Sequence, residues 1–248
     1  MAGRLKILGL TFIYLTLSSN SDAQVMDTLQ KKTKITSFVI PAVFITYGLI
    51  AISGKNPISD LDITTKDELQ EDHPLFAAHA DDYLQFAPAA AVYGLHIAGL
   101  KGKHSLSDAT ALYILSEAIM GISTHSLKSW TGRLRPNGSA NNSFPSGHTA
   151  NAFASAEFLN QEYKDSNPWI GYSGYALATA TGILRMYNNK HWLSDVVAGA
   201  GFGLLSTKVS YLLYPKLKHF IFGNHFTNYS LVPIYQQRNI GFSFTGRL

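Results

Sequence analysis

The sequence WLSDVVAGAGFGLLSTKVSYLL, residues 192–213, is the clearest sign of how this chain of 248 residues folds. Its apolar length indicates a helix. Small residues recur within it at Ala198, Gly199, Ala200, Gly201 and Gly203. Such residues allow helix backbones to approach closely, which is common in membrane helix bundles. We therefore predict a helix that packs tightly inside a bundle.

Further helical segments precede this one, and strand patterns are nearly absent between them. They cover about 36–53, 83–100, 107–127, 147–163 and 169–187. The pattern predicts an all-α fold, a bundle of five to six core helices that is embedded in a membrane. A tightly packed soluble bundle is the alternative, because the segments carry interior polar residues such as His96, Glu117 and Asn151.

The two ends of the chain differ from this body. Residues 1–23 carry basic residues, an apolar run and then small polar residues, which is the order of a secretory signal peptide. Residues 24–82 are predicted to form an N-terminal helix and an acidic polar loop, and residues 83–222 the helical bundle. In the C-terminal tail, residues 223–248, apolar and polar residues alternate and predict a short β-hairpin.

Composition narrows the possible chemistry. The chain has no Cys, which excludes disulfides, Cys-ligated zinc, iron–sulfur clusters and a thiol nucleophile. Its formal net charge of +4 comes without a long basic run. The charge therefore favours an anionic partner, for which phosphate is as good a candidate as DNA. Together with the motifs described below, we expect a phosphate compound and no nucleic acid.

Two islands of polar residues lie between the third and fourth helical segments. The first, KSWTGRLRP at residues 128–136, places three cations at the end of a helix, where the helix dipole favours positive charge in any protein. The second, NNSFPSGH at residues 141–148, runs directly into the next helix. It presents backbone N–H groups and the Ser146 hydroxyl at a helix N-terminus, which is a ready anion site.

A third island, RMYNNKHWLSD, covers residues 185–195. His191 and Asp195 are four residues apart and therefore share one face of a helix. The Asp can accept a hydrogen bond from one imidazole nitrogen and leave the other nitrogen free to attack. By itself, such a pair is more often an ordinary hydrogen bond than a nucleophile.

All three islands lie at helix ends, so antiparallel neighbouring helices would bring them to one end of the bundle. The predicted site consists of Lys128, Arg135, Ser146, Gly147, His148, Arg185, His191 and Asp195. Three cations and backbone donors suit the spread negative charge of a phosphoryl transition state. Two histidines supply a nucleophile and a proton donor.

The three islands contain K-x6-R-P ending at Pro136, P-S-G-H ending at His148, and R-x5-H-x3-D ending at Asp195. In order and spacing this resembles the type 2 phosphatidic acid phosphatase (PAP2) superfamily, which also holds bacterial class A acid phosphatases and vanadium haloperoxidases. One position departs from the family pattern. Leu184 stands where the family often has a supporting Ser before the Arg of the third motif.

The resemblance implies a metal-independent phosphatase. His191 would attack phosphorus and form a phosphohistidine, with Asp195 holding its ring, and His148 would protonate the leaving oxygen and then activate water. The phosphate oxygens would be held by Lys128, Arg135, Arg185, the Ser146 hydroxyl and the Gly147 N–H. No cofactor and no metal are expected, because the only acid predicted near the site is Asp195 and cations make an unsuitable shell for Mg²⁺.

The predicted function is hydrolysis of a phosphorylated lipid in a bacterial envelope, with vanadate as an inhibitor. Phosphatidic acid, phosphatidylglycerol phosphate, isoprenyl pyrophosphate and lipid A phosphate remain open as substrates. A secreted, soluble, non-specific acid phosphatase is the alternative. A vanadium haloperoxidase is disfavoured because those relatives are generally much longer.

Charge bias predicts that the site faces the periplasm. Lysine clusters at residues 31–34, 101–103 and 216–218 would lie in the cytoplasm, and the acidic residues 55–82 outside. A cleaved signal peptide followed by six spans would instead place the site inside. We therefore expect segment 36–53 to lie against the bundle without spanning. An uncleaved N-terminus and a soluble periplasmic protein are the alternatives.

Overall fold

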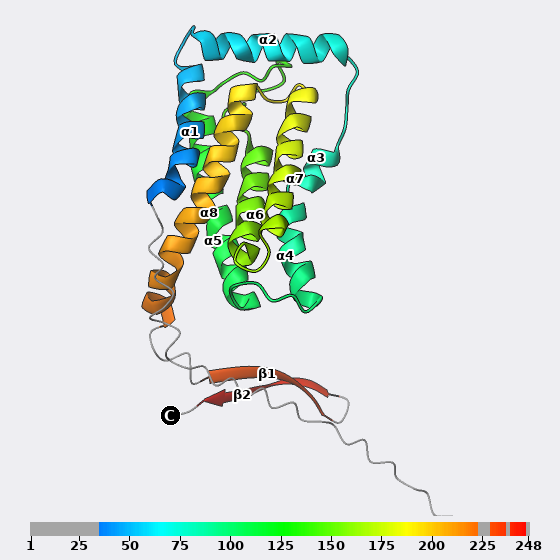
Figure 1. Cartoon of the computed structure of the whole chain (residues 1–248). Coiled ribbons are helices and arrows are strands. Elements are labelled where there is room, and N and C mark those ends of the chain that lie inside the picture. Colours follow the sequence, from blue (N-terminus) through cyan, green and yellow to red (C-terminus); the bar gives the residue numbers. More distant parts are fainter. Residues whose placement is uncertain (1–34, 223–228, 237–238, 247–248) are drawn as a thin grey trace, which may run out of the picture. The chain divides into compact units, whose positions relative to one another are not determined.

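The computed structural model describes residues 35–222, 229–236 and 239–246. A short 3-10 helix at Ile35–Phe38 leads into the helical body (Figure 1). The helices are α1 Val39–Ile52, α2 Pro57–Asp72, α3 Ala80–Leu84, α4 Ala87–Ile97, α5 Leu106–Thr131, α6 Gly147–Tyr163, α7 Pro168–Tyr187 and α8 Leu193–Phe222. The prediction of an all-α body is confirmed.

Helix α6 lies at the centre of the body and packs against α4, α5, α7 and α8. Its alanines at 150, 152, 154 and 156 are fully buried, as is Phe158. The Phe158 ring stacks on Tyr113 of α5. A helix surrounded in this way has little side-chain freedom at its first turn, which is where the sequence places Ser146, Gly147 and His148.

The small residues of α8 are needed for close packing on two sides. A Cβ atom at Gly203 would lie 2.2 Å from the Ala150 carbonyl oxygen of α6, and one at Gly201 would lie 2.8 Å from the Pro41 oxygen of α1. Real Cβ atoms do not come this close to backbone, so only glycine fits. The predicted tight packing of this helix is confirmed.

Helix α1 runs antiparallel to α8. Gly48, near the end of α1, approaches Ala198 near the start of α8, whereas Pro41 approaches Gly201 further along. The carboxyl end of α1 therefore lies at the end of the bundle where α8 begins. The opposite face of α1 is uncovered and exposes Val39, Ile40, Val43, Leu49 and Ile50.

The prediction of a polar loop over the acidic residues 55–82 is wrong, because most of this stretch is helical. Asn56 caps α2 through a reciprocal capping box with Ser59, and Pro57 occupies the first helical position. These local signals start a helix without an apolar stripe. Helix α2 lies across the end of the bundle (Figure 1).

Two further boundaries differ from the predictions. The expected helix over 83–100 is divided into α3 and α4. Helix α8 continues beyond residue 213 to Phe222, through Pro215. Pro215 and the residues that follow it to Ile221 are exposed, whereas Tyr214 is half-buried and donates a hydrogen bond to Asp108 of α5 at 2.6 Å.

The C-terminal hairpin is confirmed as an antiparallel pair of strands, β1 Tyr229–Gln236 and β2 Asn239–Gly246. The register pairs Tyr229 with Gly246, and Gln236 with Asn239 at the turn. The predicted signal peptide, residues 1–23, lies outside the described residues.

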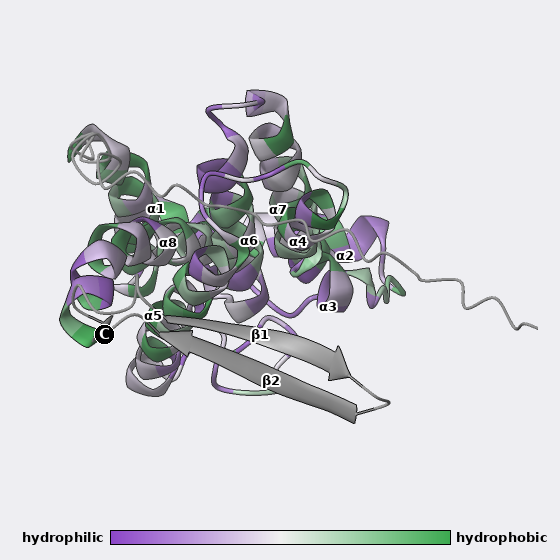
Figure 2. Cartoon of the chain, turned by 90° about the horizontal axis from the view of Figure 1, so that it is seen from below, coloured by the Kyte–Doolittle hydropathy of each residue, from purple (hydrophilic) through white to green (hydrophobic). Residues whose placement is uncertain are grey.

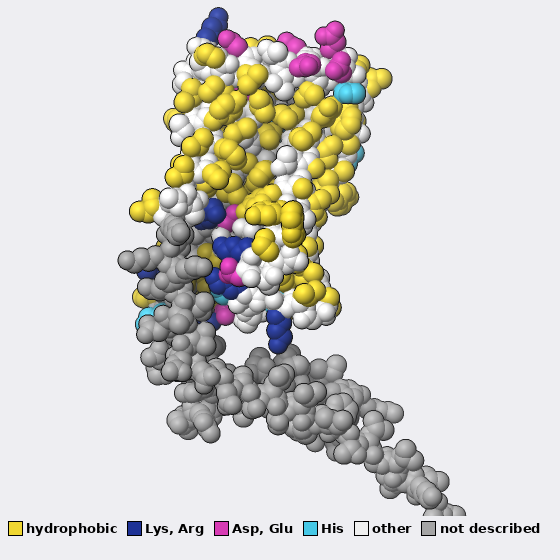
Figure 3. Space-filling view, in the orientation of Figure 1, with side chains coloured by type: hydrophobic (Ala, Val, Ile, Leu, Met, Phe, Trp, Pro, Cys, Tyr) yellow, Lys and Arg dark blue, Asp and Glu magenta, His cyan; other side chains and the backbone are white. Residues whose placement is uncertain are grey.

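Two helices of the described chain are long and apolar enough to cross a membrane, Ile35–Ile52 and Leu193–Ile221. Hydropathy colouring shows green, hydrophobic stretches on α1, α5 and α8 (Figure 2). In the space-filling view, hydrophobic side chains cover the face formed by α1, α7 and α8, below the acidic side chains of α2 (Figure 3). An apolar face of this kind marks a surface that contacts lipid or protein.

Candidate active site

Four helix ends meet beneath α2. Lys128 lies in the last turn of α5 and Arg185 in the last turn of α7, whereas Ser146 caps α6 and Asp195 lies in the first turn of α8. The Ser146 N–H donates to the Asp195 carbonyl oxygen at 3.0 Å, which ties the start of α6 to the start of α8. The three sequence islands are thus brought to one end of the bundle.

His191 is held as a neutral imidazole with one nitrogen free. It is 3% exposed, and its Nδ1 lies 2.8 Å from the Ser143 carbonyl oxygen, an acceptor that requires a proton on Nδ1. Burial lowers the pKa of His191 to about 4, although the Asp195 carboxylate opposes this shift. At neutral pH, Nε2 therefore carries a lone pair, as a nucleophile must.

Asp195 is completely buried and lies 3.7 Å from His191 Nδ1. This distance is longer than a hydrogen bond, so the carboxylate acts on the ring mainly through its charge, while the Ser143 carbonyl sets the tautomer. The carboxylate accepts hydrogen bonds from the Ser143 hydroxyl, from the Trp192 N–H at 3.0 Å and from Arg133 at 2.6 Å. Its position is therefore fixed.

Arg133 and Asp62 support this arrangement, and sequence reasoning assigned neither of them to the site. The Arg133 guanidinium bridges Asp195 and Asp62 at 2.6 and 2.7 Å, and the Asp62 carboxylate also accepts from Ser194. Asp62 belongs to α2 and is 1% exposed. Because Asp62 lies 71 residues before Arg133, no local sequence pattern indicates that these two residues form an ion pair.

Lys128 and Arg135 both donate hydrogen bonds to the same uncharged residue, Asn142. Lys128 Nζ donates to the Asn142 carbonyl oxygen at 2.7 Å, and Arg135 Nε donates to the Asn142 side-chain oxygen at 2.9 Å. Within the described part of the chain, neither cation has an acidic partner within 4.0 Å. Burial lowers the pKa of Lys128 to about 8. Their positive charge is thus available to an anion.

Arg185 is 7% exposed and bonds Asp81 of α3 through NH1 at 2.6 Å. Its Nε is one of three buried side-chain polar atoms in the described residues without a hydrogen-bond partner. An unsatisfied buried donor of a charged group costs about 1–3 kcal/mol or more, so native proteins seldom keep one without a use. A phosphate oxygen is an acceptor that would satisfy it.

His148 occupies the second position of α6 and is half-buried. Its Nε2 lies 2.9 Å from Asp82 Oδ1. Burial lowers the pKa of His148, and the charge of Arg185 lowers it further, whereas Asp82 raises it.

Ser146 serves first as the N-cap of α6. Its fully buried hydroxyl accepts from the Thr149 N–H at 3.4 Å and lies 2.9 Å from the Thr149 hydroxyl. Gly147 begins the helix, and a Cβ atom there would lie 3.8 Å from Lys128 Cε. The first turn of α6 therefore lies next to the Lys128 side chain of α5.

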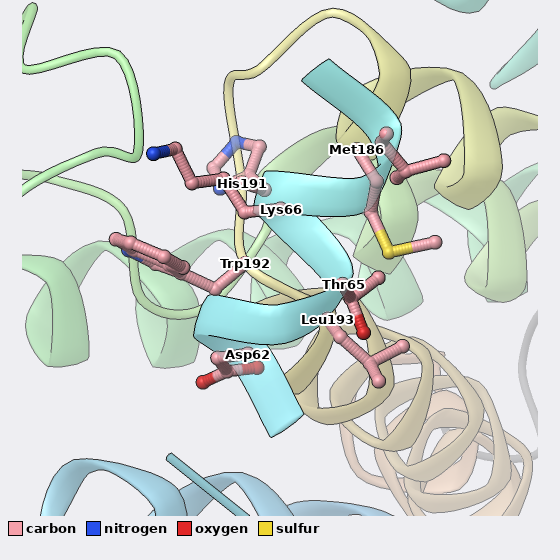
Figure 4. Close-up of a pocket in the computed structure, with 8 residues that line it drawn as sticks. Asp62, Thr65, Lys66, Met186, His191, Trp192 and Leu193 are labelled. Carbon is pink, nitrogen blue, oxygen red and sulfur yellow. The ribbon is translucent and has the colours of Figure 1, made fainter. Parts of the chain in front are cut away.

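A small cavity separates α2 from the connection between α7 and α8 (Figure 4). It is lined by Asp62, Thr65, Lys66, Leu69, Met186, His191, Trp192 and Leu193. Residues of α2 therefore line the same cavity as His191, in addition to the contacts that His191 makes with the three islands.

The prediction that Asp195 is the only acid near the site is wrong, because Asp62, Asp81 and Asp82 all reach it from the acidic stretch. Asp81, Asp82 and His148 each place one polar atom within 4.8 Å of the others. Both carboxylates are already paired with a cation or an imidazole, so we assign these contacts to charge pairing.

Comparisons with known proteins agree with the motif pattern. Residues 109–219 match the family model described as PAP2 superfamily. The chain is 41% identical over 142 residues to a lipid A 1-phosphatase of Porphyromonas gingivalis, a match that covers 55% of this chain and 31% of that relative. The match thus spans about a third of the length of that relative.

Two solved structures resemble the bundle. The crystal structure of a transmembrane PAP2-type phosphatidylglycerolphosphate phosphatase from Bacillus subtilis gives a TM-score of 0.51 at 21% identity, over 73% of this chain and 98% of that one. The crystal structure of Aquifex aeolicus LpxE gives 0.45 at 20% identity, over 59% and 93%. Residues 109–219 thus match the PAP2 superfamily model, and the chain is similar to phosphatases of that type.

Proposed function

We propose that this protein is a metal-independent phosphatase that removes phosphate from a membrane lipid through a phosphohistidine intermediate. The observation that carries the proposal is the group of cations around a neutral, buried His191. Lys128 and Arg135 have no acidic partner among the described residues, and Arg185 keeps an unsatisfied Nε–H. This arrangement supplies positive charge and directed donors to a phosphoryl group.

In the first step, His191 Nε2 attacks phosphorus and the bond from phosphorus to the ester oxygen breaks. The Nδ1–H bond to the Ser143 carbonyl keeps the attacking nitrogen unprotonated. Asp195 stabilises the positive charge that develops on the ring. Lys128, Arg135 and Arg185 hold the three phosphoryl oxygens, together with the Gly147 N–H and the Ser146 hydroxyl.

His148 provides the proton transfers. As an imidazolium it donates a proton to the leaving oxygen, so that the lipid departs as an alcohol or as a phosphate. As a neutral base it then takes a proton from water, whose oxygen attacks phosphorus while the bond to His191 breaks. Inorganic phosphate is released and both histidines return to their starting state.

A lipid substrate is favoured by the exterior of the bundle. Helix α1 exposes five large apolar residues. The space-filling view shows hydrophobic side chains over the face formed by α1, α7 and α8 (Figure 3). Ile35–Ile52 spans about 27 Å as a helix, close to the roughly 30 Å of a bilayer core. A site at the end of such a bundle meets lipid headgroups. This observation favours a membrane enzyme over a soluble acid phosphatase.

The 41% identity to a lipid A 1-phosphatase makes lipid A phosphate the first substrate to test. We propose further that the site faces the periplasm. This orientation is supported by the lysines at residues 101–103, between α4 and α5, and at 216–218, near the end of α8, which lie at the end of the bundle away from the site. The positive-inside rule favours the cytoplasm for such lysines.

The decisive experiment measures phosphate release by the purified protein from lipid A, phosphatidic acid, phosphatidylglycerol phosphate and a soluble aryl phosphate. We expect lipid substrates to be preferred, vanadate to inhibit and EDTA to have no effect. His191→Ala should abolish turnover, and wild type should accumulate a phosphoenzyme that is stable to alkali and labile to acid. A strict metal requirement or phosphate on a serine would refute the mechanism, and preference for the soluble ester would refute the lipid assignment.

A further inference from the structure

Helix α3 is a short acidic element whose place beside the site is fixed by the end of α7. The Asn188 side chain accepts from the Ala78 N–H at 3.0 Å and donates to the Ala78 carbonyl oxygen at 2.7 Å. These two hydrogen bonds to the backbone of Ala78 fix the position of the chain just before α3. Asp81, 1% exposed, then pairs with Arg185 of α7.

The next residue, Asp82, is directed at His148. Asp82 Oδ1 lies 2.9 Å from His148 Nε2, while its other oxygen lies 3.6 Å from the exposed ring of His79. The second ring nitrogen of His148, Nδ1, has no hydrogen bond among the described residues. A carboxylate on one nitrogen orients the imidazole and leaves the other nitrogen for a substrate.

The surroundings of His148 lower its pKa overall, and Asp82 opposes this shift. Half-burial and the nearby Arg185 guanidinium both lower the pKa of His148. The two acids of α3, Asp81 and Asp82, raise it, and Asp82 acts both through its hydrogen bond and through its charge. A proton donor beside three phosphate-binding cations needs such a counter-ion to keep its proton.

We propose that Asp82 is a positioning residue for the proposed reaction, holding His148 through Nε2 so that Nδ1–H points to the leaving oxygen. The inference rests on the proposed function, in which His148 is the proton donor. Asp82 itself does not contact the phosphoryl group. Its effect should therefore depend on how much help the leaving group needs.

The test compares wild type with Asp82→Asn on alkyl, phenyl and 4-nitrophenyl phosphate. A general acid contributes about 10²–10⁴-fold where the leaving group is poor. We expect kcat/KM of Asp82→Asn, which reports formation of the phosphoenzyme, to fall about 100-fold for the alkyl ester and less than about threefold for the nitrophenyl ester. Asp82→Glu should recover part of the loss. Asp72→Asn, at an exposed acid of α2 with no ion pair in the described chain, is the matched control.

An equal loss on all three esters, or none, would overturn the inference. A second measurement does not require activity: the pKa of His148, followed by NMR of its ring nitrogens, should be lower in Asp82→Asn than in wild type. An unchanged pKa would overturn the inference as well. Absence of phosphate release by wild type would instead refute the proposed function, and the two failures are thus distinguishable.

Discussion

At the residue scale, the two histidines of the site lie in different surroundings. His191 is buried against a carbonyl oxygen and is neutral, whereas His148 faces a carboxylate. Pairs of titratable groups with contrasting surroundings are how acid and base roles are divided at one pH. The assignment of nucleophile and proton donor therefore follows from the environment of each ring as well as from its motif.

This contrast predicts the pH dependence of kcat/KM. His191 must be unprotonated, and its pKa of about 4 means that activity is lost only as pH falls to that value. His148 must be protonated, and its pKa is below the usual 6.5, so activity declines as pH rises through that lower value. We expect a bell-shaped profile with an acidic optimum, measured in detergent with an alkyl phosphate, whose poor leaving group needs the proton donor. An optimum above pH 8 would contradict these roles.

A second prediction at this scale concerns Arg133, which neutralises two buried acids. Arg133→Met leaves Asp62 and Asp195 without their cation, and breaking a buried pair in this way costs about 3–5 kcal/mol. We expect a lower unfolding temperature in detergent and a lower kcat. Adding Asp62→Leu to Arg133→Met should recover part of the stability, because one uncompensated charge is removed. If the two substitutions together change the unfolding temperature by the sum of their separate effects, Arg133 and Asp62 do not interact.

At the element scale, the position of α8 depends on glycines that touch neighbouring backbone. Gly203→Ala would place a methyl group 2.2 Å from the Ala150 oxygen, and overpacking of this kind costs about 1–3 kcal/mol. Gly94→Ala is the matched control, because a Cβ atom there meets nothing within 4 Å. We expect Gly203→Ala to lower the unfolding temperature. Gly94→Ala should raise it slightly, since alanine favours a helix by about 0.5–1 kcal/mol over glycine.

Helix α2 shows how an element without an apolar stripe joins a packed site. It is docked by Asp62, whose carboxylate reaches both Arg133 and the Ser194 N–H beneath it. The remaining acids of α2 largely face outward. The stretch that the charge pattern predicts to be a loop is thus a helix that lies against His191.

At the scale of the whole molecule, the arrangement predicts which surface can be labelled in intact cells. The chain has no Cys, so single substitutions report without background. Asn141→Cys lies in the exposed loop beside the site, and Asp165→Cys lies in the exposed connection between α6 and α7 at the other end of α6. We expect a membrane-impermeant thiol reagent to label Asn141→Cys but not Asp165→Cys before the inner membrane is opened. The reverse pattern would place the site in the cytoplasm.

What the sequence alone determined is local. The predicted segment 147–163 coincides with α6, because Ser146 is a strong cap and the apolar pattern that follows is continuous. His191 and Asp195 were found by their spacing along one helix.

Only the tertiary structure decided which distant acids complete the site. Asp62 lies 71 residues from Arg133, and Asp82 lies 66 residues from His148. Eight acids occupy residues 55–82, and nothing in their order distinguishes the three that contact site residues. Charge pairing between distant segments depends on how helices dock, and docking is set by packing of the whole bundle, which no local pattern encodes.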